Sequence, residues 1–392
     1  MRSGFNTFSL EPDKHRFLLL GSKDRVQRDH LLDHLEEASY SLEGYKSVVI
    51  GDYGRGKTHQ SKNLEFEIDS RQLSLYPIYV KCTEFKSKES FATFFHELVR
   101  SIPTEYLQSL AKEYEAQRSQ NSLPELSDVI GDQYIAEVFR NGLAAPNIDV
   151  VNRAMRWLGG EQKLDMTTIA RELPDLHVSK QFGAVMKGLV QLFREVGGKV
   201  PVFLIDEAER FTLVTNIDAY WSWLAALREL TEINGVALVF FIGAKNRDEL
   251  PAMFLTDEVM TRIGVSNYVE FYNQGRDDLR NFLNELFATV VRKGPPPEEL
   301  RKVLAEHIDA EIDETVPAEL EAILREEDED IETYPLSGEA FEELIELCAT
   351  ADLSNKPREV LKLVQKAAGR AMRKQNRLID VTTLQDVSKE GI

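Results

Sequence analysis

The sequence predicts an α/β fold with a parallel sheet, a large helical insertion and a helical C-terminal domain. Short apolar runs at residues 45–50, 200–205 and 236–242 are rich in β-branched and aromatic residues, which is typical of buried strands. Residues 87–198 show helical periodicity instead, and so does the chain after residue 275. Because the stretch from 87 to 198 is longer than the crossover of a simple βαβ unit, we interpret it as an insertion.

Residues 51–58 read GDYGRGKT and match the complete phosphate-binding pattern GxxxxGK[ST] between a predicted strand and a helix predicted over 58–66. In such a loop the backbone N–H groups surround phosphates, and the helix N-terminus adds its positive dipole end. Lys57 would reach the β- and γ-phosphates of ATP, and the Thr58 hydroxyl would bind Mg²⁺. Alternatively, Gly54 and Gly56 only shape a turn. The predicted nucleotide-binding residues are Gly51, Asp52, Tyr53, Gly54, Arg55, Gly56, Lys57, Thr58 and His59.

Two carboxylates, Asp206 and Glu207, follow the apolar run 200–205 directly, which is the arrangement of a Walker B motif. Asp206 would hold Mg²⁺, usually through water, and Glu207 would polarise the water that attacks the γ-phosphate. Adjacent Asp and Glu favour a hydrolysing enzyme over a passive nucleotide binder. The alternative is that both residues simply begin a solvated helix after a core strand.

A third polar segment follows the apolar run 236–242. Ligand-contacting groups gather at the carboxyl ends of parallel strands, so a polar residue here could bind the γ-phosphate or the attacking water. Asn246 is the predicted residue, and Lys245 is the second choice. An ordinary polar loop is the alternative for either residue.

These motifs, followed by Arg262 and by Asn355-Lys-Pro-Arg358, resemble an AAA+ ATPase. In that superfamily an arginine late in the core reaches the nucleotide of the neighbouring subunit, and another in a lid helix contacts the γ-phosphate of its own subunit. The resemblance therefore implies catalytic roles for Arg262 and Arg358. Arg276 is an alternative finger. Arg262 could instead cap a helix, and Arg358 could be an exposed residue after a proline.

Within AAA+, the chain resembles the origin-recognition and initiator-like clade, closest to BREX-type phage-defence ATP-binding proteins and transposition regulators. Supporting residues are Tyr79-Val-Lys-Cys82, Arg156-Trp-Leu-Gly-Gly-Glu161 and the helical stretch 181–196. The resemblance implies an ATP- and Mg²⁺-dependent ATPase switch that forms a homo-oligomer when ATP binds, and that acts on or near DNA in bacterial genome defence or mobile-element control. About thirty residues follow Arg358, so we expect no autonomous sequence-specific DNA-binding domain.

The alternative function is a nucleotide-gated signalling or scaffold protein that recruits an effector without contacting DNA. No nuclease, protease or transferase constellation accompanies the ATPase motifs, so we expect a separate effector or operon partner to supply such chemistry.

The predicted domains are an N-terminal arm (1–16), a nucleotide-binding core (17–274) and a helical lid (275–392). The net charge is −19, and thirteen acids with one base lie within residues 306–332. This acidic segment is predicted to be a solvated helix face or loop. The alternatives are a docking surface for a basic partner and a device that repels DNA from one face. No apolar run approaches the roughly 20 residues needed to span a bilayer, and the two cysteines lack metal-ligand spacing, so we expect a cytoplasmic protein without a membrane partner.

Overall fold

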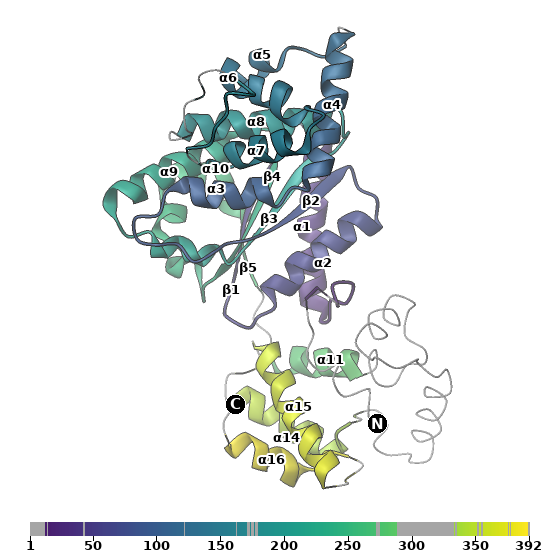
Figure 1. The fold of residues 1–392 in the computed structure, drawn as a ribbon. Coiled ribbons are helices and arrows are strands. Elements are labelled where there is room, and N and C mark those ends of the chain that lie inside the picture. The colour runs from purple at the N-terminus through teal and green to yellow at the C-terminus, as the bar shows by residue number, and fades with distance from the viewer. Residues whose placement is uncertain are drawn as a thin grey trace. The chain divides into compact units, whose positions relative to one another are not determined.

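The computed structural model divides the chain into two compact units, which we describe separately (Figure 1). Unit 1 comprises Met1–Asp29, Asp52–Asn63 and Phe271–Ile392, and unit 2 comprises His30–Gly51 and Leu64–Glu270. The structure describes residues 12–13, 15–41, 44–120, 122–161, 163–170, 173, 176, 179–271, 275–287, 333, 335–350, 353, 356–374, 376 and 378–390. The acidic segment 306–332 and Asn355 lie outside the described residues.

Unit 2 contains a five-stranded sheet in the order β2-β3-β4-β1-β5, and the paired strands are parallel. The strands are β1 (Tyr45–Gly51), β2 (Leu75–Lys81), β3 (Val200–Asp206), β4 (Ala237–Gly243) and β5 (Tyr268–Glu270). Every residue of β1 and β3 is buried, as expected for strands covered on both faces. The three strands predicted from apolar runs, and with them the α/β parallel-sheet class, are confirmed.

The register of the sheet brings the carboxyl ends of four strands to one edge. Gly51 pairs with Gly243, and Lys81 pairs with Asp206. Since β4 lies between β1 and β3, the loop that follows β4 starts between the residues that follow the other two strands. Chain segments far apart in sequence therefore leave the sheet side by side.

Helices account for most of the remaining described residues. In chain order they are α1 (Ser22–Tyr40), α2 (Lys57–Ser70), α3 (Phe91–Arg100), α4 (Thr104–Ser119), α5 (Leu126–Ile130), α6 (Gln133–Glu137), the π-helix η2 (Val138–Leu143), α7 (Ile148–Leu158), α8 (Ser179–Glu195), η3 (Ala208–Leu213), α9 (Ile217–Glu232), η4 (Arg247–Glu249), η5 (Ala252–Leu255), α10 (Asp257–Ile263), η6 (Val265–Asn267), α11 (Arg276–Phe287), α14 (Gly338–Thr350), α15 (Pro357–Arg373) and α16 (Val381–Lys389). The helices α3 to α8 fill the region between β2 and β3, where the sequence predicts an insertion.

An aromatic cluster joins the insertion to the sheet. The indole ring of Trp223 in α9 lies 4.8 Å from the ring of Phe85, 5.2 Å from that of Phe91 and 5.1 Å from that of Phe211, between ring centroids. Such edge-to-face pairs add to the stabilisation that comes from burying the rings. The apolar stripe of α3 belongs to this core, as its helical spacing predicts. Its buried members include Phe91, Phe94, Phe95, Leu98 and Val99.

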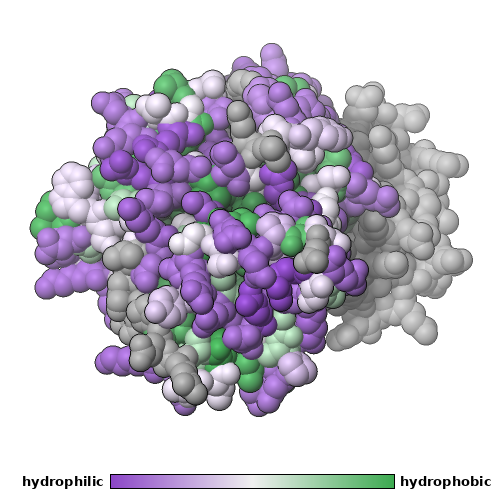
Figure 2. All heavy atoms as spheres, turned by 90° about the horizontal axis from the view of Figure 1, so that it is seen from above, coloured by the Kyte–Doolittle hydropathy of each residue, from purple (hydrophilic) through white to green (hydrophobic). Residues whose placement is uncertain are grey.

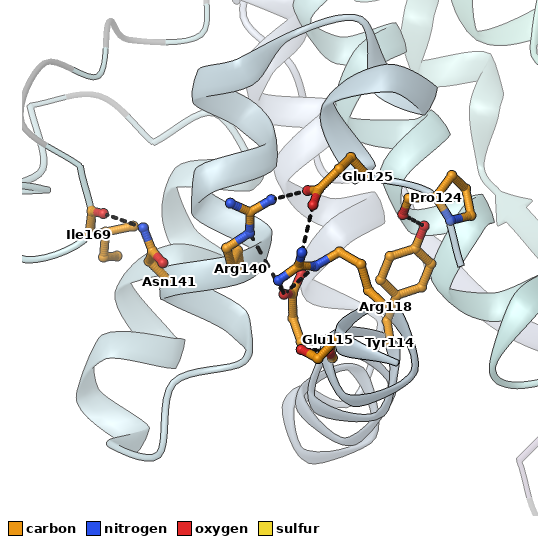
Figure 3. Close-up of polar contacts among 9 residues, drawn as sticks. Tyr114, Glu115, Arg118, Pro124, Glu125, Arg140, Asn141 and Ile169 are labelled. Carbon is orange, nitrogen blue, oxygen red and sulfur yellow. Dashed lines mark hydrogen bonds and ion pairs between the residues drawn. The ribbon is translucent and has the colours of Figure 1, made fainter. Parts of the chain in front are cut away.

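A charged network ties the helices of the insertion together (Figure 3). Arg118 of α4 donates to Glu115 on its own helix at 2.8 Å and to Glu125, just before α5, at 2.6 Å. Arg140 of the π-helix η2 also donates to Glu125. Because these side chains are partly exposed, each pair contributes at most about 1 kcal/mol, and the network serves mainly to fix how the short helices meet.

The core of unit 1 is a small helical bundle formed by α11, α14, α15 and α16. Its buried residues include Leu283 of α11, Leu344 of α14, Val364 of α15 and Leu384 of α16. Leu18, from the segment before α1, packs into the same cluster. The amphipathic spacing of these sequences predicts such a bundle, and the structure has it.

Hydrophilic residues cover most of the face seen in Figure 2, and hydrophobic ones are scattered in small spots. Exposed apolar side chains such as Tyr40 and Trp221 are common on ordinary protein surfaces. Within the described part of the chain, no helix is both long and apolar enough to cross a membrane.

Candidate nucleotide-binding site

The phosphate-loop motif begins where β1 ends. Gly51 is the last residue of β1, and its carbonyl accepts a hydrogen bond of 3.1 Å from the Ala244 amide, just beyond β4. The start of the loop is thus held on the sheet by an adjacent strand. The expected helix follows and begins at Lys57, within one residue of its predicted start.

Two glycines give the loop its conformation. Gly54 has φ +82° and Gly56 has φ +98°, in a region that costs other residues about 1–2 kcal/mol. A Cβ built on Gly56 would meet nothing within 4 Å. The loop therefore has both the backbone that only glycine adopts easily and open space beside it, which allows a ligand to approach the main chain closely.

Lys57 is buried, and its ammonium group turns back to the loop. Nζ donates a hydrogen bond of 3.0 Å to the Asp52 carbonyl and lies 5.5 Å from the centre of the Tyr53 ring. Thr58 is the second residue of α2 and is half-buried. The loop thus holds a cation against its own backbone at the N-terminus of a 14-residue helix, where the helix dipole also favours an anion.

Two of the predicted nucleotide-binding residues, Arg55 and His59, use their side chains to contact residues 18–24. The Arg55 guanidinium is buried and pairs with Asp24 of α1. The Nε2 atom of His59 is hydrogen-bonded to the Leu18 carbonyl, and burial lowers the pKa of the imidazole. Arg55 thus contacts the first turn of α1 and His59 contacts the segment before α1, while the backbones of both residues belong to the motif.

Asp206 ends β3 and is buried with both carboxylate oxygens engaged. Oδ2 accepts a hydrogen bond of 2.9 Å from the Tyr79 hydroxyl, and Oδ1 accepts one of 2.9 Å from the Glu207 amide. Tyr79 was not predicted to be a functional residue, although the segment Tyr79–Cys82 supports the resemblance to the initiator-like clade. Side chains alternate between the two faces of a sheet, and Tyr79 pairs with Leu204, two residues before Asp206, so the pairing of β2 with β3 puts Tyr79 on the same face as Asp206.

Glu207 adopts a left-handed backbone, with φ 59° and ψ 34°. Its Oε1 atom lies 3.1 Å from the Lys81 ammonium, and its Oε2 atom forms an ion pair with Arg210. The carboxylate expected to activate water is therefore held by two cations. Neither Lys81 nor Arg210 was predicted, because each becomes a partner of Glu207 only through the pairing of β2 with β3 and the turn of η3.

The short helix η3, which follows β3, provides a further carboxylate at this edge of the sheet that was not predicted. Glu209 accepts a hydrogen bond of 2.7 Å from the amide of Gly243, the last residue of β4.

Asn246 is exposed, and its side-chain oxygen caps η4 by accepting from the Asp248 amide at 2.9 Å. Lys245 is also exposed. The choice between Asn246 and Lys245 as the phosphate-sensing residue stays a prediction.

Arg262 lies in the last turn of α10. Its Nε atom donates to Glu232 of α9 at 2.6 Å, and one terminal nitrogen donates to the Glu258 carbonyl at 2.7 Å. A cation at this position also interacts favourably with the helix dipole. These contacts support the helix-cap interpretation within one chain, and the role of Arg262 as a finger towards another subunit stays a prediction.

Arg358 is the second residue of α15, and it lies beside the phosphate loop. A Cβ built on Gly54 would be 3.9 Å from the Arg358 Cβ, and both residues belong to unit 1. The Arg358 side chain is exposed. The alternative finger, Arg276 of α11, forms an ion pair with Glu346 of α14 instead.

The groups present fit a magnesium nucleotide. In the described part of the chain, no cluster of three or more His, Cys, Asp or Glu residues could bind a metal ion without further ligands. Mg²⁺ is commonly held by only one or two protein oxygens together with phosphate oxygens and water. Thr58, at the start of α2, offers a hydroxyl oxygen, and Asp206, at the end of β3, offers a carboxylate, and both are ligand types of that chemistry.

No family model and no curated protein matches the chain. Among solved structures it is similar to Cdc6p from Pyrobaculum aerophilum, with 12% identity over 98% of this chain and 70% of that chain and a TM-score of 0.45. It is also similar to the ORC1 protein of Aeropyrum pernix in complex with DNA, with 12% identity over 96% of this chain and 67% of that chain and a TM-score of 0.41. At this level the likeness carries no argument about activity, which must come from the residues.

Proposed function

We propose that this protein binds ATP with Mg²⁺ and hydrolyses it, as an ATPase of the AAA+ type. The observation that carries the proposal is the loop at residues 51–58, with its two left-handed glycines and the buried Lys57 ammonium turned back to the loop backbone. The loop continues directly from β1, and Asp206 ends β3 at the same edge of the sheet.

Each residue has a proposed role. The loop amides and Lys57 bind the β- and γ-phosphates, while Thr58 and Asp206 hold Mg²⁺. When bound, Mg²⁺ neutralises charge on the phosphates. Glu207 orients the attacking water and accepts its proton. Arg358, next to Gly54, contacts the γ-phosphate from the same subunit.

The test compares ATP binding and hydrolysis in three variants. Lys57→Ala removes a charged hydrogen-bond donor, so we expect affinity for a fluorescent ATP analogue to fall about tenfold to a hundredfold. Glu207→Gln should keep binding but lower the rate of phosphate release by about 10²- to 10⁴-fold. Lys112→Ala, an equivalent change on the exposed face of α4, is the control. Wild-type protein without measurable ATP binding, or a Glu207→Gln variant with the wild-type rate, would refute the proposal.

A second candidate is an ATP-gated switch with slow basal hydrolysis, which recruits an effector. The observation that favours it is the ion pairing of Glu207 with Lys81 and Arg210, because a carboxylate so engaged must change partners before it can activate water. If this pairing limits turnover, Lys81→Ala should raise basal hydrolysis. An unchanged or lower rate in this variant would count against the gate.

We further propose that ATP promotes a homo-oligomer which acts on or near DNA in bacterial genome defence or mobile-element control, with a separate effector. The sequence resemblance to initiator-like AAA+ proteins supports this part. Particle mass and ATPase rate should be measured with and without ATP, and with double- and single-stranded DNA. An unchanged mass with ATP would exclude ATP-promoted assembly, and rates unaffected by DNA would favour the signalling candidate.

A further inference from the structure

Three consecutive charged residues in the first turn of α1 connect to two different parts of unit 1. Asp24 pairs with Arg55 of the phosphate loop, whereas its neighbours Lys23 and Arg25 pair with carboxylates of α11. We call Lys23, Asp24 and Arg25 the charged triplet. All of its partners belong to unit 1 together with the triplet itself.

The contact with the loop is buried. The two terminal nitrogens of Arg55 lie 3.2 and 3.4 Å from the Asp24 carboxylate oxygens, and the guanidinium lies 5.2 Å from the centre of the Phe271 ring. Burial raises the pKa of Asp24 and lowers that of Arg55, so each charge depends on the other to remain buried. Arg55 stands between the two left-handed glycines, and its anchor therefore restrains the turn.

Two ion pairs connect the first turn of α1 to the lid helix α11, and one of them is bidentate. Arg25 donates to the two oxygens of Glu285 at 2.6 and 2.8 Å, and the Gly21 amide donates to the same carboxylate at 2.8 Å. Lys23 donates to Asp278 at 2.7 Å. The two carboxylates are seven residues apart on α11, so they lie two turns apart on the same face.

Lys23, Asp24 and Arg25 lie in the same helical turn of α1. A displacement of α11 that moves Lys23 and Arg25 therefore also moves Asp24. Conversely, a change in the loop that moves Arg55 is transmitted to α11. The lid also approaches the loop at a second place, where Arg358 of α15 lies beside Gly54. The triplet is thus a contiguous physical connection between the loop and α11, of the kind through which coupling can travel.

We propose that Asp24 is a positioning residue: through its ion pair with Arg55 it keeps the phosphate loop in the conformation that binds ATP. Lys23 and Arg25, through their ion pairs with α11, couple this conformation to the position of α11. The inference rests on the proposed function, since it concerns the binding of the same nucleotide. It adds a second route from loop to lid, separate from the contact made by Arg358.

The first experiment separates positioning from simple structural support. Asp24→Asn removes the carboxylate charge beside the buried Arg55 and so loosens the hold on the loop. We therefore expect the KM for ATP to rise about tenfold while kcat at saturating ATP stays within about threefold. The loss is then one of ground-state binding, because Asp24 does not touch the reacting atoms. An unchanged KM in a folded Asp24→Asn variant would overturn the role assigned to Asp24.

The second experiment tests the link to the lid and does not require Asp24 to be changed. Hydrogen exchange of α11 is measured with and without ATP in Arg25→Glu, in Glu285→Arg and in the variant that carries both changes. We expect ATP to slow exchange in α11 of the wild type, this response to be lost in each single variant, and the double variant to regain it, because the ion pair is restored with its direction reversed.

The control is Arg280→Ala, on the same helix, whose guanidinium pairs with Glu342 inside the lid and touches no member of the triplet. It should keep the ATP response of α11. If both single variants keep the response, or if Arg280→Ala loses it equally, the coupling is refuted. Binding of the ATP analogue by the wild type is measured first, so that failure of the proposed function is distinguishable from failure of this inference.

Discussion

The left-handed backbone of Glu207 predicts an inverted order of stability between two small substitutions. At most positions alanine is more stable than glycine, because glycine loses more conformational freedom on folding, by about 0.4–1 kcal/mol. With φ 59° and ψ 34°, position 207 should behave in the opposite way. Glu207→Gly and Glu207→Ala both remove the ion pairs with Lys81 and Arg210, so that loss cancels when the two are compared.

The magnitude follows from two opposing terms. Relief of the left-handed conformation favours glycine by about 1–2 kcal/mol. Subtracting the entropic cost of glycine leaves Glu207→Gly more stable than Glu207→Ala by about 0.5–1 kcal/mol. With a urea m value of about 2–3 kcal/mol/M, the unfolding midpoint of the glycine variant should be higher by about 0.2–0.5 M.

The assay is urea unfolding of both variants, followed by fluorescence, together with ATP hydrolysis. Both variants should have lost hydrolysis. Gln72 provides a matched control, since it is exposed, lies away from the site and has φ 54°. Glycine should also exceed alanine in stability there, with turnover unchanged. An alanine variant at position 207 that is at least as stable as the glycine variant would refute the strained backbone conformation of Glu207.

Three further outcomes follow from the site. Arg358→Ala should reduce hydrolysis with little change in protein stability, because the side chain is exposed; unchanged ATPase and assembly would leave it an ordinary surface residue. Mixing Arg262→Ala with Lys57→Ala, both expected to be inactive alone, should partly restore hydrolysis if the arginine acts across subunits, whereas no recovery in mixtures shown to co-assemble would leave Arg262 as a helix cap. Burial raises the pKa of the Cys82 thiol well above its usual value and that of Cys348 to about 12, so alkylation at pH 8 should be very slow in the folded protein and rapid for both thiols in guanidinium chloride; fast labelling without denaturant would contradict their burial.

The elements that carry the site were predictable because their signals are local. The apolar runs before Gly51, Asp206 and Gly243 have the composition of buried strands, and each became a strand within one residue of its predicted bounds. The phosphate-binding pattern likewise placed glycines at positions 54 and 56, and the structure gives both of them positive φ angles. Hydrophobic period and glycine conformation depend on neighbouring residues and can therefore be read along the chain.

The partners of the charged side chains could not be predicted in this way. The sequence shows Arg55 as a variable position of a phosphate loop, but its partner Asp24 lies 31 residues earlier on another helix. Arg262 and Glu232 are 30 residues apart, and Tyr79 and Asp206 are 127 apart. An ion pair or hydrogen bond of this kind forms only when its two groups come within a few ångströms of each other. The residue pattern of each segment does not show which distant residue will lie that close.

By itself, therefore, the sequence determined three of the five strands, the phosphate loop and the order of its acidic and basic motifs. Only the tertiary structure decided that Lys81 and Arg210 hold Glu207, that Arg358 lies beside Gly54, and that the charged triplet of α1 connects the loop to α11. The physical reason is that backbone conformation responds to the nearest residues, whereas electrostatic partners are selected by the packing of whole elements.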